Sequence, residues 1–298
     1  MAAREHHDTL DDLLDSFELT LRAERKSPRT IANYLTSARL FADHLGRRHV
    51  LDATRPDIEA FVADQLERHS ASTAATRFRC LQQFYRWTVR DEFLDASPMD
   101  GLTPPKLTEK VIPVIPADDL RALLRSCEGK AFDDQRDKAI VLFMLDTGAR
   151  LAETTGLQVD DVAAKRQEAI VHGKGDRHRR VYFSAATAVA LDRYLRARRR
   201  HDWATSPKLW LGVRGPLTDS GLAQMLRRRS RDAGIAHVHP HMLRHTWAHL
   251  MKAGGMADDE VMALGGWRTS QMLGRYGSSA RAERARATFQ RLAPGDQL

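Results

Sequence analysis

Hydrophobic residues recur at intervals of three and four along the first ninety residues, with polar residues between them. This spacing places them on one face of a helix and predicts a domain of amphipathic helices. Ser27 followed by Pro28 is typical of a helix start, because serine caps free N–H groups and proline suits the first turn. Helices are expected from about Leu10 to Leu21, from Ser27 to near Gly46, from about Pro56 to His69, and from about Ser72 onward.

A proline-rich stretch interrupts this helical pattern at residues 97–116. Its five prolines suppress helix and favour extended backbone. They are Pro98, Pro104, Pro105, Pro113 and Pro116. The stretch is therefore predicted to be a linker between a helical domain at residues 1–96 and a second domain at residues 117–298.

The second domain is predicted to combine helices with a few short strands. The hydrophobic pattern indicates strands at 157–162, 168–172 and 179–183, and Gly173-Lys174-Gly175-Asp176 has the composition of a hairpin turn between the last two. Helices are expected from about Ala117, at 140–146, 184–200, 219–233, 241–253, 258–264, 269–274 and 280–292. The predicted fold is mainly α with a small antiparallel β-sheet.

The chain carries 47 Lys and Arg against 39 Asp and Glu, a formal net charge of +8. This excess favours a polyanionic partner, of which nucleic acid is one and an acidic membrane surface another. The N-terminus has no apolar signal region, and no apolar run approaches a membrane span. Cys80 and Cys127 form no CxxC pair, so we expect buried thiols in a reducing cytosol rather than a zinc site or a disulfide framework.

Three segments supply side chains suited to binding and attacking a phosphodiester. They are Thr-Gly-Ala-Arg-Leu-Ala-Glu at 147–153, Pro-His-Met-Leu-Arg-His-Thr-Trp at 240–247, and Leu-Gly-Gly-Trp at 264–267 followed by Tyr276. Attack on a phosphodiester builds charge on the phosphoryl oxygens, which clustered carboxylates with metal ions or a set of arginines can stabilise. The paired aspartates of the chain fit helix starts or loops, which leaves arginine, whose planar fork donates to two phosphate oxygens at once.

Spacing suggests how these side chains cooperate. Glu153 lies one helical turn from Arg150, close enough to hold its guanidinium, and His241 and Arg244 share one face of a helix. Among the five tyrosines, Tyr276 has the least core-like context. The other four lie in helical or strand contexts that predict core-facing side chains; they are Tyr34, Tyr85, Tyr182 and Tyr194. Each feature alone has an ordinary structural alternative, such as a surface arginine after glycine or a structural His-x-x-Arg pair.

In this order, and with Gly-Lys-Gly-Asp on a hairpin, the segments resemble the tyrosine recombinase (phage integrase) family. The resemblance covers residues 116–292, and Ser-Pro-Arg-Thr-Ile-Ala-Asn-Tyr at 27–34 resembles the second helix of the family's core-binding domain. It implies a helical core-binding domain and an α+β catalytic domain that form a C-shaped clamp on DNA. The helical domain starts by about Thr9, so a compact form without an arm-binding domain is expected.

The resemblance implies a role for each residue of the site. Arg150 and Arg244 grip the scissile phosphate. Lys174 protonates the leaving 5′ oxygen, His241 is the general acid/base, and Glu153 orients the site. Tyr276 is the nucleophile that forms a 3′-phosphotyrosine.

The third segment departs from the commoner Leu-Gly-His pattern of the family. Gly266 stands where that histidine would sit, while Trp267 lies nine residues before Tyr276 and is the better match. Indole is a hydrogen-bond donor only, so Trp267 can bind phosphate but cannot act as a base. Plain core filling is the alternative for Trp267.

Arginines between buried aromatics in the segment from Ser72 to Arg90 indicate a helix with its back in a core and its front on phosphates. A solvated amphipathic helix is the alternative. The basic stretches 193–200 and 227–231 are further candidates for phosphate contacts. The DNA-binding residues expected in the helical domain are Arg29, Arg77, Arg79 and Arg86.

The resemblance implies a site-specific recombinase that uses no metal, ATP or other cofactor and has no membrane partner. It is expected to bind double-stranded core sites as a homo-tetramer on two DNA sites, to be a monomer or weak oligomer when free, and to work at the nucleoid of a bacterial cytoplasm. The tail after Tyr276 favours integration or excision of a phage or mobile element, and its helix docks either in cis or on a neighbouring protomer. The alternatives are Xer-like chromosome-dimer resolution, a type IB topoisomerase-like enzyme, a non-catalytic DNA-binding protein and, last, a metal nuclease.

Overall fold

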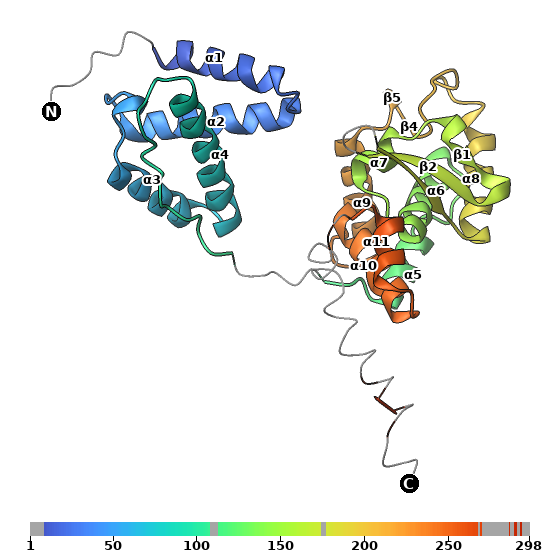
Figure 1. Ribbon diagram of the computed structural model, residues 1–298. Coiled ribbons are helices and arrows are strands. Elements are labelled where there is room, and N and C mark those ends of the chain that lie inside the picture. The colour runs from blue at the N-terminus through green and yellow to red at the C-terminus, as the bar shows by residue number, and fades with distance from the viewer. Residues whose placement is uncertain are drawn as a thin grey trace. The chain divides into compact units, whose positions relative to one another are not determined.

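The computed structural model describes residues 9–107, 113–173 and 177–267, together with the single residues 269, 286, 289, 290 and 293. The chain forms two compact units, Met1–Lys110 and Val111–Leu298 (Figure 1). The boundary falls inside the proline-rich stretch 97–116. In the described part of the chain, no helix is long and apolar enough to cross a membrane.

The first unit is a bundle of four helices. They are α1 (Leu10–Ala23), α2 (Pro28–Leu45), α3 (Arg55–Arg68) and α4 (Ala71–Arg90), with a 3-10 turn η1 (Val50–Asp52) before α3. Aromatic rings fill the core, where Phe41 lies 5.3 Å from Phe61 and Phe17 lies 5.5 Å from Phe84, both in edge-on contact. The expected helical domain is therefore confirmed.

The start and end of α2 follow the sequence signals. The Ser27 hydroxyl accepts a hydrogen bond from the Thr30 N–H at 3.2 Å, Pro28 occupies the first turn, and the helix ends at Gly46 with φ of +69°. Serine satisfies one of the N–H groups that a helix start leaves without a partner, and glycine adopts the positive φ without steric cost. The two thiols are also where we expected them, since Cys80 and Cys127 are free and buried.

The second unit packs helices around a small antiparallel sheet. The helices are α5 (Ala117–Arg125), α6 (Phe132–Thr147), α7 (Leu151–Gly156), α8 (Ala185–Arg198), α9 (Asp219–Asp232), α10 (Pro240–Ala253) and α11 (Asp258–Gly265). Strands β1 (Val162–Ala163), β2 (Glu168–Gly173) and β3 (Arg177–Tyr182) form the sheet in the order β1-β2-β3, with Ala169 opposite Val181. The buried α6 contacts both α8 and α10.

Three details differ from the sequence prediction. The expected strand 157–162 is mainly a 3-10 turn, η2 (Val159–Asp161), because the Asp161 carboxylate accepts the Gln158 N–H at 2.8 Å and closes the chain into a turn. Helix α6 extends over sixteen residues rather than the apolar part alone. A short hairpin of β4 (Leu211–Gly212) and β5 (Gly215–Pro216) was not expected, since two-residue strands have no hydrophobic period.

A buried ion-pair network explains why α6 starts earlier than its apolar part. Asp137 is fully buried and accepts hydrogen bonds from three arginines, Arg136 at 2.7 Å and Arg228 and Arg229 at 2.8 Å each. Arg229 also binds Asp134 at 2.9 Å. Buried charges persist only when they are paired, so this network joins α6 to α9. Arg229 is therefore structural, which corrects the expectation that the whole basic stretch 227–231 faces phosphates.

Replacing Arg229 by alanine is expected to destabilise the chain by about 3 kcal/mol or more, because it removes a partner of the fully buried Asp137 and of the partly buried Asp134. Denaturant unfolding followed by tryptophan fluorescence measures this. Arg227→Ala, at an exposed position of the same helix, is the matched control and should change stability by less than about 0.5 kcal/mol. Equal effects of the two substitutions would show that the network does not stabilise the fold.

Candidate active site

The turn between α6 and α7 places Arg150 at the N-cap of α7, directly before its first residue Leu151. Gly148 ends α6 with φ of +59°, and a Cβ built there would lie 2.2 Å from a ring atom of Trp247. Glycine is required on both grounds, since other residues strain at positive φ and a side chain would overlap the indole. The backbone therefore brings the Gly148 carbonyl and Arg150 close to α10, which carries Trp247.

Glu153 is the central acid of the site. Its side chain is buried, and Arg150 donates to it twice, from the backbone N–H at 2.8 Å and from the guanidinium at 2.7 Å. Burial alone would raise the pKa of Glu153, but hydrogen bonds from Arg179 and from Arg150 outweigh it and lower the pKa to about 2. Glu153 is therefore ionised at neutral pH and holds its arginines as a fixed negative charge.

Arg179 is a site residue that the sequence analysis did not find. It lies on β3, and its two terminal nitrogens donate to the two carboxylate oxygens of Glu153 at 2.7 Å each. Its Nε donates to the Leu264 carbonyl at 2.8 Å. The available signal was alternation along the strand, because Arg179 shares a face with the buried Val181. A charge on an inward face requires a buried partner.

Arg244 lies on α10 and is the most buried arginine of the site, with an exposed fraction of 1%. Its two terminal nitrogens donate to the carbonyls of Gly148 and Gly265. Its guanidinium lies over the Trp267 ring, 4.2 Å from the centroid, and Trp267 in turn packs on Trp247 at 5.8 Å. Cation–π stacking and two carbonyls therefore fix the orientation of this guanidinium.

The end of α11 joins these arginines. Three consecutive carbonyls accept hydrogen bonds from three different arginines; they are those of Leu264 and Gly265 at the end of α11 and of its C-cap Gly266. The donors are Arg179, Arg244 and Arg150, the last at 3.1 Å. A helix leaves its final carbonyls without helical partners, and cationic side chains satisfy them well. The site is therefore built on the C-terminus of α11.

His241 lies one turn before Arg244 on α10 and is solvent-exposed. Although the side chain reaches solvent, desolvation by the protein around it lowers its pKa, and the positive charges of Arg244 and Arg150 add to this effect. The imidazole is thus mainly neutral at pH 7 and able to accept a proton. Its neighbour His245, 5.3 Å away, is buried, and this burial lowers its pKa to about 3.

Trp267 sits in a small apolar cluster with Trp247, Ala248 and Val261. Its exposed fraction is 6%, and its ring contacts the Arg244 guanidinium. The structure thus brings Arg150, Glu153, Arg244 and Trp267 together, with His241 on the adjoining turn. Lys174 and Tyr276 lie outside the described residues; the described strands β2 and β3 end and begin on either side of 174–176.

The other tyrosines are not all in the core. Tyr85 and Tyr194 are fully buried, and burial raises the pKa of both, that of Tyr194 to about 12. Tyr34 is half-buried. Tyr182, which we expected in the core, is 55% exposed, because it lies on the outer face of β3 with Arg180. The core-facing expectation was therefore wrong for Tyr182.

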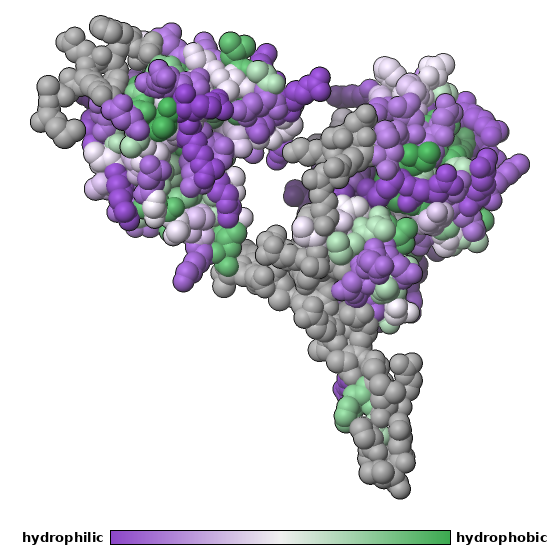
Figure 2. All heavy atoms as spheres, in the orientation of Figure 1, coloured by the Kyte–Doolittle hydropathy of each residue, from purple (hydrophilic) through white to green (hydrophobic). Residues whose placement is uncertain are grey.

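The arginines expected to bind DNA in the first unit lie at its surface. Arg29, Arg79 and Arg86 are exposed, and Arg77 is half-buried. Arg77 lines a shallow polar pocket between α2 and α4. The face of the first unit shown in Figure 2 is largely hydrophilic over its described residues, as expected of a solvated or phosphate-binding surface.

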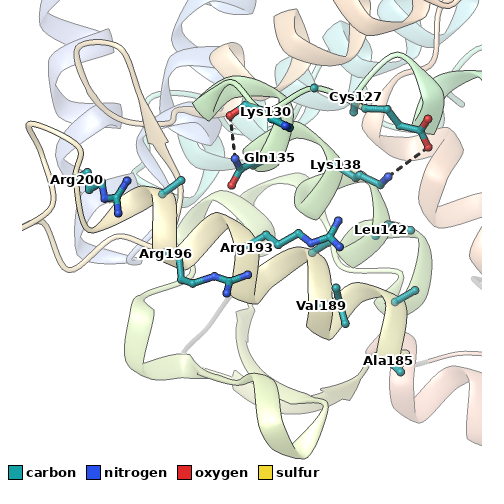
Figure 3. A pocket seen from close by; sticks show the side chains of 15 residues that line it. Cys127, Lys130, Gln135, Lys138, Leu142, Ala185, Val189, Arg193, Arg196 and Arg200 are labelled. Atoms are coloured by element: carbon teal, nitrogen blue, oxygen red, sulfur yellow. Dashed lines mark hydrogen bonds and ion pairs between the residues drawn. The ribbon is translucent and has the colours of Figure 1, made fainter.

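A pocket of about 1070 Å³ is separate from this site. It lies between α8 and the segment from Cys127 to Leu142, and none of the arginine-site residues lines it. Figure 3 shows Arg193 and Arg196 on α8 and Arg200 just after it, with Lys130 and Lys138 from the other segment. We place the chemistry at α11 rather than here, because no buried acid–arginine pair lines the pocket, and burial raises the pKa of the Cys127 thiol that does line it.

Several of the paired aspartates of the second unit lie at helix starts. Asp118, Asp133 and Asp258 lie in the first turns of α5, α6 and α11, where acids complement the helix dipole. Over the ranges that the structure describes, no group of three or more His, Cys, Asp or Glu side chains is arranged to hold a metal ion. The described part of the site supplies positive charge through arginine.

Comparisons with known proteins agree with this geometry. The sequence model of the phage integrase family matches residues 113–283, and that of the phage integrase N-terminal SAM-like domain matches residues 13–95. The chain is 30% identical to tyrosine recombinase XerC of Chromobacterium violaceum over 253 residues, 83% of each chain. It is also 30% identical to XerC of Myxococcus xanthus over 280 residues, 90% of this chain and 93% of that one.

Solved structures share the fold. The XerH recombinase bound to a palindromic difH substrate has a TM-score of 0.75 at 17% identity, covering 94% of this chain and 84% of that chain. The Tn1549 transposon integrase in complex with transposon right-end DNA also has a TM-score of 0.75, at 20% identity, covering 96% of this chain and 100% of that one. At these identities the likeness concerns the fold alone.

Replacing Gly148 by alanine is expected to destabilise the chain by at least about 3 kcal/mol, because the new Cβ meets the Trp247 ring at a positive φ. Gly234→Ala is the control, since Gly234 has a similar φ of +67° but open space around its Cβ position. It should cost only about 1–2 kcal/mol. Denaturant unfolding compares the two, and equal losses would argue against the close contact.

Glu153 should give stability a measurable pH dependence. Since its folded pKa lies below the ordinary 4.5, its ionised form stabilises the fold above that pH, and the contribution is lost as the pH falls towards 2. The stability difference between wild type and Glu153→Gln should thus stay constant from pH 7 to 5 and narrow below 4.5. Unfolding curves across this range test it, and a difference independent of pH would contradict it.

Proposed function

Because the chain belongs to the phage integrase family of tyrosine recombinases, enzymes that cleave and rejoin DNA at specific sites, we propose that it acts through a covalent bond between Tyr276 and a DNA 3′ phosphate. The observation that carries this proposal is the convergence of Arg150, Arg244 and Trp267 at the end of α11. Tyr276 follows Trp267 by nine residues in the sequence.

Arg150 and Arg244 bind the scissile phosphate in the proposed mechanism. A guanidinium has five N–H donors, and the described contacts of the half-exposed Arg150 side chain engage one on each terminal nitrogen. Donors therefore remain for a phosphate. Two arginines on one phosphate offset the charge that grows on its oxygens during attack, and no metal ion is required for this.

The proton transfers in this mechanism balance. The Tyr276 oxygen forms a bond to phosphorus as the bond from phosphorus to the 5′ oxygen breaks. The phenolic proton passes to neutral His241, and Lys174 protonates the departing 5′ oxygen. A 5′ hydroxyl of another strand then gives its proton to Lys174 and attacks the phosphotyrosine. This attack restores a phosphodiester, and His241 returns a proton to the released Tyr276 oxygen. Because the covalent link conserves the bond energy, neither ATP nor another cofactor is consumed.

Contacts with the duplex backbone are proposed for Arg29, Arg77, Arg79 and Arg86 of the helical unit. Contacts of this kind position a protein without reading base sequence, and several of them make binding strongly dependent on salt. The proposed complex is a tetramer on two core sites that forms from monomers or weak oligomers. A lambda integrase with the same fold has been seen as a tetramer on a Holliday junction. We place the enzyme at the nucleoid of the bacterial cytoplasm.

Integration or excision of a phage or mobile element is the role we propose, on the basis of the arginine-rich tail sequence 275–286. Chromosome-dimer resolution is the second candidate, because the similar curated proteins at 30% identity are XerC recombinases. Genomic sequence separates the two. An attachment-like repeat flanking the gene supports integration, whereas a single site near the replication terminus supports dimer resolution.

Covalent trapping tests the nucleophile. The probes are DNA duplexes selected for binding to the protein from a pool with a randomised centre. Each selected duplex is resynthesised with a nick, placed at successive positions in different probes. Cleavage next to a nick releases a short fragment that diffuses away, so the covalent adduct cannot be religated. Wild type and Tyr182→Phe should both form the adduct, because the exposed Tyr182 is not part of the site, while Tyr276→Phe should form none. Denaturing gels measure the adduct with EDTA present.

An adduct that survives Tyr276→Phe overturns the assignment of the nucleophile. Binding without any cleavage by wild type would favour a non-catalytic DNA-binding protein, and loss of cleavage in EDTA would favour a metal nuclease. Relaxation of plasmids that carry no selected site would favour a type IB topoisomerase-like enzyme.

A further inference from the structure

We propose that Arg179 is a positioning residue for strand cleavage, which keeps Arg150 available to the phosphate and holds the end of α11 in place. Arg179 does so through Glu153 and the Leu264 carbonyl, without contacting DNA. The inference rests on the proposed function, because it assigns to Arg150 the binding of the scissile phosphate.

All three guanidinium nitrogens of Arg179 are engaged inside the protein. Two donate to Glu153 as a fork at 2.7 Å each, and Nε donates to the Leu264 carbonyl at 2.8 Å. The side chain is 15% exposed. A fork that matches both oxygens of a carboxylate is the strongest geometry for such a pair, so this contact takes precedence in orienting Glu153.

The fork controls how Glu153 holds Arg150. Because Arg179 faces both carboxylate oxygens, the Arg150 side chain meets Glu153 through one nitrogen only, at 2.7 Å, and its other terminal nitrogen reaches the Gly266 carbonyl. Without Arg179, the carboxylate is open to a fork with Arg150 itself. Such a pair would turn the Arg150 donors away from the phosphate position and weaken the grip on the transition state.

The second contact of Arg179 anchors α11. The Arg179 Nε donates to the carbonyl of Leu264, and a Cβ built on Gly266 would lie 3.2 Å from the Arg179 Nη1 atom. Gly266 thus permits the close approach of the guanidinium to the end of the helix. The Arg179 side chain joins strand β3 to Glu153 on α7 and to the end of α11. Its removal therefore loosens Arg150 and the start of the segment towards Tyr276 together.

The adjacent Arg180 provides a matched control. It lies on the opposite, exposed face of β3 and pairs with Glu168 at 2.9 Å. Arg180 and Arg179 thus carry the same charge on the same strand, one residue apart. Arg180→Ala removes the same positive charge from the same strand as Arg179→Ala does, but it removes no contact with Glu153 or Leu264.

The experiment compares cleavage of two forms of a selected nicked duplex, one with an ordinary scissile phosphate and one with a neutral methylphosphonate in its place. Arg179→Ala should slow cleavage of the phosphate about 100-fold, as expected when a catalytic group shifts by about an ångström. DNA affinity should change by less than about 3-fold, because Arg179 does not contact DNA. On the methylphosphonate substrate, Arg179→Ala should slow cleavage by less than about 10-fold, since attack on a neutral phosphorus centre depends less on the positive charge of the arginines.

Arg179→Lys keeps the charge but loses the fork, and should fall between wild type and Arg179→Ala on the phosphate substrate. Thermal unfolding shows whether each variant is folded. If Arg179→Ala does not fold, Arg179→Lys tests the proposal in its place. Arg180→Ala should cleave both substrates within about 2-fold of wild type, as expected of a surface site outside the machinery.

Two results would overturn the proposal. One is an Arg179 variant that cleaves the phosphate at the wild-type rate, and the other is an equal loss on both substrates, which indicates a purely structural role. Failure of the proposed function is distinguishable, because then wild type itself forms no adduct that depends on Tyr276.

Discussion

The site depends on the hydrogen bonds between arginine side chains and the backbone carbonyls at the C-terminus of α11. The carbonyls of Leu264, Gly265 and the C-cap Gly266 need partners once the helix ends. Three arginines donate to them, from the N-cap of α7, from α10 and from β3. The same arginines supply the positive charge that a phosphate requires. A backbone requirement of the helix and a chemical requirement of the reaction are therefore met by one set of side chains.

Burial and pairing set the charge states around this helix end. Glu153 stays ionised despite its burial, because Arg179 and Arg150 stabilise its charge. His241, close to the same arginines, is kept neutral at pH 7. A fixed acid, fixed cations and a neutral imidazole are thus held within two turns of helix and one strand. The deeper network around Asp137 has no part in this chemistry and serves to fix α6, which leads into the turn before Arg150.

Local sequence rules predicted the helices of the first unit well, since capping by Ser27 and the period of apolar residues depend on near neighbours. The same rules failed for residues 157–162, where a side chain at Asp161 caps a turn. They also placed Tyr182 in the core, because alternation along a strand does not say which face is covered. Arg179 was missed for a related reason, since its partners lie 26 and 85 residues away in the chain.

The sequence by itself determined the two helical regions, the linker, the candidate residues Arg150, Glu153, His241 and Arg244, and their family resemblance. These depend on spacing within short segments, where helix geometry fixes which side chains meet. Only the tertiary structure decided that three arginines share the end of α11, that Arg179 belongs with them, and that Trp267 stacks on Arg244. Such contacts join segments far apart in the chain, and packing of the whole unit selects them rather than any local pattern.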